Sequence, residues 1–371
     1  MSLQQRSQLA VTRENNAPLQ TLKNGLSKNQ VAPRLALSTR STNVATVTSH
    51  VLKATKPKLQ PASLKQTVVE VPKPAPKSVQ IDKIPLPIDM VDIDEDDMEH
   101  LEFSSVYVKD IYQYLFKIEG QNAAHPQYLQ KHPTLRAHMR MILVEWLVSL
   151  QARFKLLQET LLMTVSILDR YMSETDMEVS RSKFQLVGVA CMLVACKYEE
   201  MYLPSVSDFA YMCDGAYTSD DILRMERIVL STLQFEFAKP LSAHFLRRFS
   251  KAGGADSLTH TMAKYFLELA LYDYSLVHCN PSVVAAASLF IAGRVTGIVE
   301  WDETVQYYSQ YKTEDLSFVV GKLAELGATV ETNKYLKTTY KKYAADKFQR
   351  VAKVVVQSKE IAQLAKKPAS N

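Results

Sequence analysis

The side chains that could support enzymatic or metal chemistry are scattered through the sequence. His244, His260 and His278 lack the short spacing of a metal-binding motif, and no serine or cysteine stands in a nucleophile–base motif. The four cysteines form no Cys-x-x-Cys pair, and two of them lie in an apolar helical segment typical of buried thiols in a reducing compartment. We therefore expect no catalytic residues, no metal and no cofactor. An enzyme remains an alternative only if residues distant in sequence meet in the fold.

Charged side chains at helical spacing are better candidates for function. Lys197 and Glu200 are three residues apart, which on its own indicates a surface ion pair that stabilises little. His260 and Lys264 are four residues apart and so share one face of a helix, and Arg247 precedes them on a neighbouring helix. Taken alone, three basic residues on a helical bundle indicate a solvated face. Their interpretation depends on the elements that carry them.

Helical periodicity governs the chain from about residue 104 onward, with apolar residues at three- and four-residue intervals. A short amphipathic helix is predicted around Tyr107, Ile111 and Tyr114. Two sets of five helices follow, at about 135–154, 159–173, 182–198, 205–212 and 219–232, and at about 242–251, 257–274, 281–295, 302–310 and 313–335. Each set contains one helix that is apolar on all sides and must be surrounded by the others. We predict an all-α fold of two tandem five-helix domains.

Residues 1–90 have a different composition. They contain 9 of the 15 prolines, none of the 33 aromatic residues, and 13 Lys and Arg against 4 Asp and Glu. Such a segment cannot bury enough apolar surface to offset its ordering entropy, so we predict a long disordered N-terminal arm. Six acidic residues lie within 91–100. They indicate either a cluster of negative charge that is favoured by the positive N-terminal end of the next helix, or a solvated charged linker.

Several classes of protein are disfavoured. The chain has neither a G-x-G-x-x-G nor a G-x-x-x-x-G-K-[ST] motif, so a nucleotide site of either kind is not expected. The N-terminus lacks the apolar core of a signal peptide, and the longest apolar runs are shorter than the roughly 18 residues of a membrane helix. We expect a soluble, intracellular protein that binds no membrane.

Five motifs, in order, resemble a known family. Residues 139–143 (Met-Arg-Met-Ile-Leu) resemble the MRAIL element of the cyclin box, with Met141 in place of alanine. The match continues with Leu-Gln-Glu-Thr at 157–160, Met-Thr-Val-Ser-Ile at 163–167, Gln-Leu-Val-Gly at 185–188 and Lys-Tyr-Glu-Glu at 197–200. The resemblance covers about 104–345 and is greatest to the mitotic B-type members. It implies a protein without chemistry of its own that activates a mitotic cyclin-dependent kinase at the G2/M transition.

The resemblance divides the chain into a basic regulatory arm with an acidic linker (1–100), a pre-box helix (101–135), an N-terminal cyclin box (136–238), a C-terminal cyclin box (239–345) and a C-terminal tail (346–371). It also implies three binding surfaces. The kinase-binding surface comprises Lys197 and Glu226 as polar contacts, Tyr198 and Leu230 as apolar neighbours, and Tyr107 and Ile111 on the pre-box helix.

The second implied surface is a docking patch for Arg-x-Leu motifs of substrates or inhibitors. Its members are Met139, Ile142, Leu143, Trp146, Phe184 and Gln185. From periodicity alone, the first four would be read as a core stripe. Phe184 stands where leucine is common, and Ser149 stands where A-type members carry an acid, which predicts weaker attraction for the arginine of the motif. The third surface is a phosphate pocket made by Arg247, His260 and Lys264, which implies phosphorylated partners.

The arm resembles a degron region. Arg6, Leu9 and Asn15 are similar to a destruction box read by the anaphase-promoting ubiquitin ligase, and Arg34 and Leu37 form a second candidate. This implies ubiquitin-dependent destruction at mitotic exit, with cell-cycle-dependent residence in the cytoplasm and nucleus. The strongest alternative is a nucleic-acid-associated factor, since general transcription initiation factors also use tandem cyclin-like folds. Because the whole chain carries +5 and residues 1–90 carry +9, residues 91–371 carry −4, and we expect no specific nucleic acid as partner.

Overall fold

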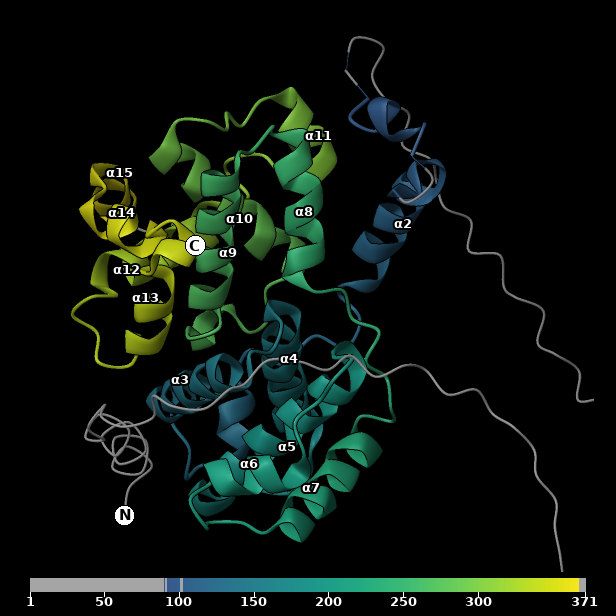
Figure 1. Cartoon of the computed structure of the whole chain (residues 1–371), viewed down its shortest axis with the longest axis vertical. Coiled ribbons are helices and arrows are strands. Elements are labelled where there is room, and N and C mark those ends of the chain that lie inside the picture. Colours follow the sequence, from purple (N-terminus) through teal and green to yellow (C-terminus); the bar gives the residue numbers. More distant parts are fainter. Residues whose placement is uncertain (1–89, 91, 101–102, 367–371) are drawn as a thin grey trace, which may run out of the picture. The chain divides into compact units, whose positions relative to one another are not determined.

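The computed structural model describes residue 90, residues 92–100 and residues 103–366, and these belong to one compact unit. Within these ranges every regular element is helical, as predicted (Figure 1). Residues 1–89 of the predicted disordered arm, with both degron candidates, lie outside the described residues.

The first set of five helices surrounds α5. Its helices are α3 (Ala137–Phe154), α4 (Gln158–Glu174), α5 (Arg181–Glu199), α6 (Val206–Met212) and α7 (Ser219–Thr232). Helix α5 packs against α3, α4 and α7, and its residues from Phe184 to Cys196 are all buried, which explains why its sequence is apolar on every side.

The second set repeats this arrangement around α10. Its helices are α8 (Ser242–Ala252), α9 (Ser257–Ala270), α10 (Pro281–Thr296), α11 (Glu303–Ser309) and α12 (Ser317–Thr329). Helix α10 packs against α8, α9 and α12 and begins with Pro281 in its first turn. It is capped after Thr296 by Gly297, whose φ of 72° suits glycine.

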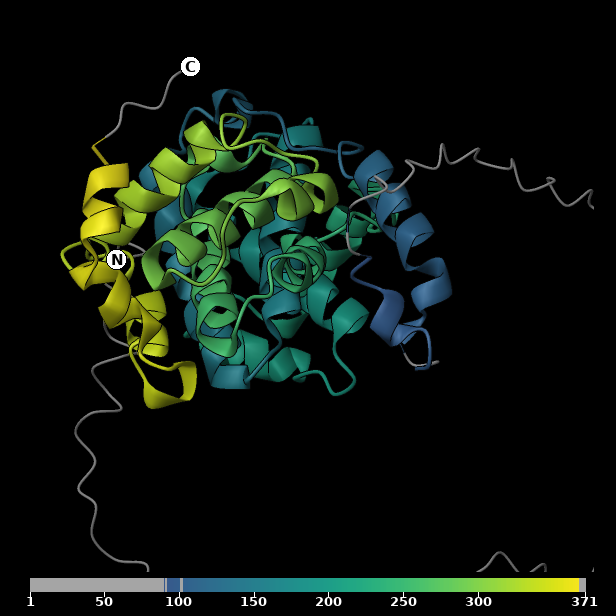
Figure 2. The ribbon, with the colours of Figure 1, turned by 90° about the horizontal axis from the view of Figure 1, so that it is seen from above.

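The chain beyond residue 345 differs from the predicted tail. The structure places three short α-helices after α12: α13 (Lys337–Tyr343), α14 (Val351–Gln357) and α15 (Lys359–Leu364). Val351, Val355 and Ile361 are buried, and α14 and α15 pack against α12 (Figure 2). Residues 351–364 therefore complete the second domain. Helices of six or seven residues carry too few apolar positions for the period to be recognised.

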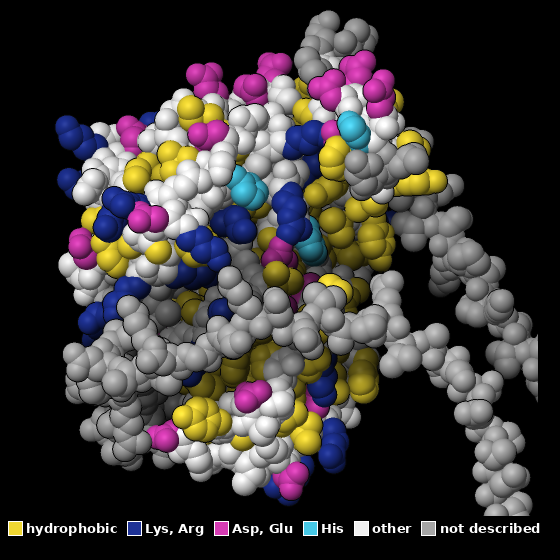
Figure 3. Space-filling model, viewed as in Figure 1, with side chains coloured by type: hydrophobic (Ala, Val, Ile, Leu, Met, Phe, Trp, Pro, Cys, Tyr) yellow, Lys and Arg dark blue, Asp and Glu magenta, His cyan; other side chains and the backbone are white. Residues whose placement is uncertain are grey.

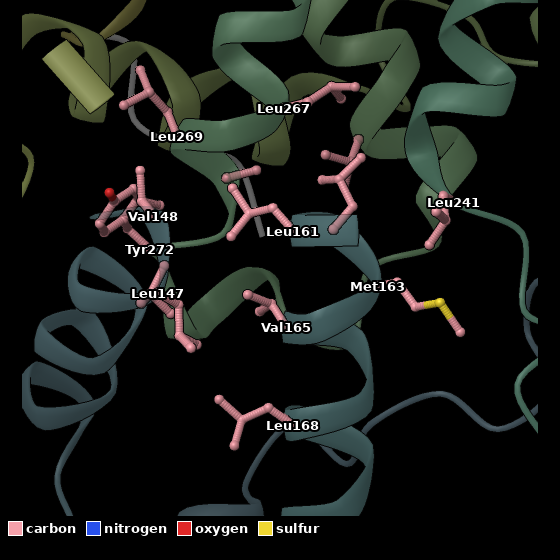
Figure 4. Close-up of a cluster of buried hydrophobic side chains, with 14 of the residues drawn as sticks. Leu147, Val148, Leu161, Met163, Val165, Leu168, Leu241, Leu267, Leu269 and Tyr272 are labelled. Atoms are coloured by element: carbon pink, nitrogen blue, oxygen red, sulfur yellow. The ribbon is translucent and has the colours of Figure 1, made fainter. Parts of the chain in front are cut away.

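One apolar core continues from the first helix set into the second. Figure 4 shows side chains of α3 and α4, among them Leu147 and Leu161, near Leu267 and Leu269 of α9. A buried ion pair lies beside this core: the Arg140 guanidinium donates to both carboxylate oxygens of Asp169 at 2.7 and 2.6 Å.

The acidic run before the pre-box helix has a partner that neither sequence interpretation anticipated. Asp94 is buried and forms a two-pronged ion pair with Arg248 of α8, with 2.6 Å between Oδ2 and Nη2. Lys251, one turn later, pairs with Asp97. These contacts hold the segment on the second domain, beside helix α2 (Ser105–Ile118).

In the described part of the chain, no helix is both long and apolar enough to cross a membrane, and no group of His, Cys, Asp and Glu could hold a metal ion. All four cysteines are free thiols. Burial raises the pKa of Cys196 and of Cys213 to about 12, so both are protonated at neutral pH.

Candidate functional site

The last turn of α5 and the middle of α7 bring a lysine and a glutamate together. The Nζ atom of Lys197 donates a hydrogen bond to Oε1 of Glu226 at 2.6 Å. The Lys197 side chain is 46% exposed and that of Glu226 only 7%, so the pair lies at the edge of the core. Leu230, one turn after Glu226, is half-buried on the same face of α7. The alternative pair with Glu200 is not formed, because the Glu200 carboxylate accepts hydrogen bonds from the start of α4.

Large apolar side chains in and just after the last turn of α5 are exposed. Tyr198 is 59% exposed, and Met201 and Tyr202 are 88% and 89% exposed. Leu203 is also exposed. Clustered exposed apolar groups of this size mark an interaction site rather than an ordinary solvated surface. We name the α5–α7 surface by its residues: Lys197, Tyr198, Met201, Tyr202, Leu203, Glu226 and Leu230.

Helix α2 has two apolar faces. Tyr112 and Phe116 face α8, where the Tyr112 hydroxyl donates to a backbone carbonyl at 2.9 Å and Phe116 packs against phenylalanine rings. Tyr107, Ile111 and Tyr114 occupy another face and are all exposed. The first two are the residues that the resemblance assigns to a kinase contact, and the structure leaves them accessible.

The predicted docking patch is only partly at the surface. Met139, Ile142 and Trp146 are half-buried along α3. Leu143 and Phe184, by contrast, are 2% and 0% exposed. Those two side chains belong to the core, so they can support the patch from beneath but cannot contact a partner as predicted. The periodic stripe thus contains both core and surface members.

Two further α5 residues shape this patch. A Cβ atom on Gly188 would lie 2.9 Å from a methyl group of Leu143, so glycine permits the close approach of α5 to α3. Gln185 is 5% exposed, and its Oε1 atom has no hydrogen-bond partner among the described residues. An unpaired buried acceptor is costly unless a ligand or water satisfies it.

The three basic residues of the second helix set are brought together. Arg247 lies on α8 and is exposed, whereas His260 and Lys264 lie one turn apart on α9 and are half-buried. Nδ1 of His260 is 2.8 Å from the hydroxyl of Ser250. Burial lowers the pKa of His260, and the nearby positive charges of Lys264 and Arg247 lower it further, so the imidazole is neutral at pH 7. In Figure 3, Lys and Arg side chains gather with histidines over α8 and α9.

Models of two families match the two helical domains. The cyclin N-terminal domain matches residues 110–238 and the cyclin C-terminal domain matches residues 240–357. The chain belongs to the cyclin family. The G2/mitotic-specific cyclin-B of Patella vulgata is 45% identical over 263 residues, which cover 71% of this chain and 64% of the relative. The G2/mitotic-specific cyclin-B2 of Oryzias javanicus is 46% identical over 263 residues, covering 70% and 68%.

A solved structure has the same fold as this cyclin. The viral cyclin from herpesvirus saimiri is 17% identical, with a TM-score of 0.51, and the match covers 67% of this chain and 98% of the viral protein. The cyclin boxes are therefore the two helix sets around α5 and α10. This chain spans just under two thirds of the length of the Patella relative.

The resemblance did not identify all the residues that build these surfaces. The exposed run after α5 was readable in the sequence, because three consecutive large apolar residues, 201–203, follow the end of a helix. The contact of Arg247 with Glu159 of α4 could not be read from the sequence, because 88 residues separate the two.

Proposed function

We propose that this cyclin is the regulatory subunit, and not the enzyme, of a mitotic cyclin-dependent kinase that acts at the G2/M transition. The observation that carries this proposal is the Lys197–Glu226 pair beside the exposed apolar residues of the α5–α7 surface. A preformed, rigid surface of this kind can select the active position of the regulatory helix of the kinase, because it binds that state better than others. In a kinase, that position sets the Lys–Glu ion pair needed for phosphoryl transfer.

The test is a pull-down with the mitotic kinase followed by a histone phosphorylation assay. Lys197→Ala with Glu226→Ala should weaken kinase binding by more than tenfold, about 1.4 kcal/mol. The matched control removes Arg294 and Glu360, an exposed ion pair of the second box, and should retain full activation. Full activation by the Lys197/Glu226 variant would refute the assignment of the α5–α7 surface.

Substrate docking is the second part of the proposal. Met139, Ile142 and Trp146 would form the apolar contact with Arg-x-Leu segments, with Gln185 as the hydrogen-bonding group beneath them. The half-buried side chains of Met139, Ile142 and Trp146 support this role, since they leave apolar surface along α3. Met139→Ala with Trp146→Ala should impair phosphorylation of docked substrates and spare kinase binding. Equal loss of kinase co-purification would show that the patch is only structural.

Recognition of phosphorylated partners is the third part. Arg247, His260 and Lys264 would bind a phosphate, for which the planar guanidinium of arginine is suited. Reversing the charges of Arg247 and Lys264 should weaken phosphopeptide binding, and unchanged affinity in a titration would contradict this part.

Controlled destruction is the fourth part. The anaphase-promoting ubiquitin ligase would read Arg6, Leu9 and Asn15, or Arg34 and Leu37, at mitotic exit. Deletion of residues 1–45 should stabilise the protein at that stage, and normal turnover of the deletion variant would exclude the arm as degron. Cell-cycle-dependent residence in the cytoplasm and nucleus is proposed with it, and imaging of the tagged full-length chain through mitosis would test that.

A further inference from the structure

The basic cluster of Arg247, His260 and Lys264 already has an anion against it. Nη2 of Arg247 donates to Oε1 of Glu159, so an ion pair joins the second cyclin box to the first. The Arg247 side chain is 57% exposed and the Glu159 side chain 17% exposed. Arg247 is thus accessible to a ligand from solvent, while the Glu159 side chain is mostly covered by the protein.

The position of Glu159 is fixed independently of Arg247. It lies in the first turn of α4, where a negative charge is favoured by the helix dipole. Its neighbour Gln158 donates through Nε2 to the carbonyl of Lys264 at 3.0 Å and to Oε1 of Glu268, also at 3.0 Å. These bonds tie the start of α4 to α9, the helix that carries the other two basic residues of the cluster.

One carboxylate does not saturate the cluster. The ammonium group of Lys264 has no hydrogen-bond partner in the described part of the chain, and His260 uses only Nδ1, toward Ser250. Two further acids lie nearby. Burial raises the pKa of Glu199, and the negative charges of Glu159 and Glu200 raise it further, whereas the positive charge of Arg247 lowers it. The carboxylate of Glu200 is engaged at the start of α4. Donors for an incoming anion therefore remain beside an arginine that is already paired.

We infer that Glu159 is a built-in competitor for the anion position on Arg247, which lowers the affinity of every incoming anion and leaves useful affinity only to ligands that also engage Lys264 and His260. This inference rests on the proposed phosphate pocket. An aspartate or glutamate of a partner brings one charge and two oxygens, as Glu159 does. To bind Arg247, that side chain would have to displace the Glu159 carboxylate, which the protein tethers in place at an effective concentration on the order of millimolar or more.

A phosphate group can overcome this competition. A phosphoserine carries about −1.5 to −2 charges at neutral pH and three strong acceptor oxygens, so it can engage Arg247, Lys264 and His260 together. Glu159 can engage Arg247 alone among these donors. Partners with acidic side chains in place of phosphate are therefore disfavoured, which would make recognition depend on the phosphorylated state.

The experiment compares two pentapeptides in titrations of the full-length chain. Binding is monitored by NMR of histidines labelled with ¹⁵N in the imidazole. The peptides are Ala-Ala-phosphoserine-Ala-Ala and Ala-Ala-Glu-Ala-Ala. In the parent protein, the phosphopeptide should bind at least tenfold more tightly than the glutamate peptide. In Glu159→Gln, both should bind at least threefold more tightly, because neither peptide then has to displace the tethered carboxylate. The matched control, Glu303→Gln, removes a first-turn glutamate of α11 and should change neither affinity.

The outcomes separate this inference from the pocket itself. If Glu159→Gln leaves both affinities unchanged while Arg247→Glu abolishes phosphopeptide binding, the pocket stands and the competitor role of Glu159 is refuted. If the phosphopeptide binds neither the parent nor Glu159→Gln, or binds independently of Arg247, the pocket proposal fails and this inference fails with it.

Discussion

Replacement of Asp94 by asparagine should detach the pre-box segment from the second cyclin box. Asp94 and Arg248 are 3% and 5% exposed and form a two-pronged ion pair. The guanidinium also lies over the rings of Tyr112 and Tyr308, with 5.3 and 4.9 Å to the ring centroids. Asparagine keeps the shape of the side chain and removes the charge, so the perturbation is nearly confined to electrostatics.

The magnitude follows from burial. Removing one partner of a buried ion pair costs roughly 3–5 kcal/mol, because it leaves an uncompensated charge in a poorly solvated site. The aromatic rings still attract the guanidinium, so we expect a value near the lower end, about 3 kcal/mol. Asp97→Asn is the matched control. Asp97 pairs with Lys251 at the surface, where such pairs contribute roughly 0–1 kcal/mol.

The loss should appear as local opening rather than global unfolding, since α2 can separate from α8 while both cyclin boxes stay folded. A cost of about 3 kcal/mol accelerates exchange of the α2 backbone amides about 100-fold. Hydrogen exchange followed by mass spectrometry would measure this, with α5 peptides as internal reference. Arg248→Met combined with Asp94→Asn should recover part of the protection, because no buried charge is then left unpaired. Exchange in α2 within threefold of the parent, or an equal effect of Asp97→Asn, would refute the reasoning.

Three further changes test the packing of the boxes. Asp169→Asn should lower the free energy of unfolding by roughly 3–5 kcal/mol, because it leaves the buried Arg140 unpaired, and urea denaturation would measure the loss. Gly188→Ala should cost roughly 1–3 kcal/mol in the same assay, since its Cβ would crowd the facing helix, and an unchanged midpoint would show that the helices can move apart. Burial raises the pKa of Glu119 although Ser282 hydrogen bonds lower it, so this acid favours folding below about pH 4.5 and opposes it as pH rises through the raised folded pKa. Glu119→Gln should therefore gain stability relative to the parent between pH 4.5 and 7, and a difference that stays constant with pH would contradict this.

Most of the fold was accessible from the sequence because helical periodicity is local. The predicted helices of both sets match α3 to α12 closely, with the largest shortening at the ends of α9 and α12. Periodicity is less informative about which apolar stripe faces the core. On α2, Tyr107 and Ile111 belong to a regular stripe that is exposed, and Tyr112 and Phe116 make the buried contact.

The parts that sequence reasoning missed are contacts between residues far apart in the chain. Asp94 meets Arg248 across 154 residues and Glu159 meets Arg247 across 88, and no spacing rule connects such positions. The family resemblance assigned Lys197 and Glu226 to one surface but did not predict their ion pair, and periodicity alone favoured a pairing of Lys197 with Glu200. Charge patterns in the sequence show that ion pairs are available, but only the packing of helices selects the partners.

Helix α13 connects the two partner surfaces of the proposed function. At its start, the Thr338 backbone N–H and hydroxyl donate to the carboxylate of Glu145 on α3 at 2.7 and 2.6 Å. At its end, the Tyr343 hydroxyl donates to Glu268 on α9 at 2.7 Å. The helix of the docking patch and the helix of the phosphate pocket are thus held at a fixed spacing by part-buried and buried polar bonds, which are costly to break. A partner that carries both an apolar docking motif and a phosphate would gain affinity only if its linker matches that spacing, because the effective concentration falls when it does not. Rigid attachment of this kind makes the distance between motifs a determinant of specificity, in addition to the motifs themselves.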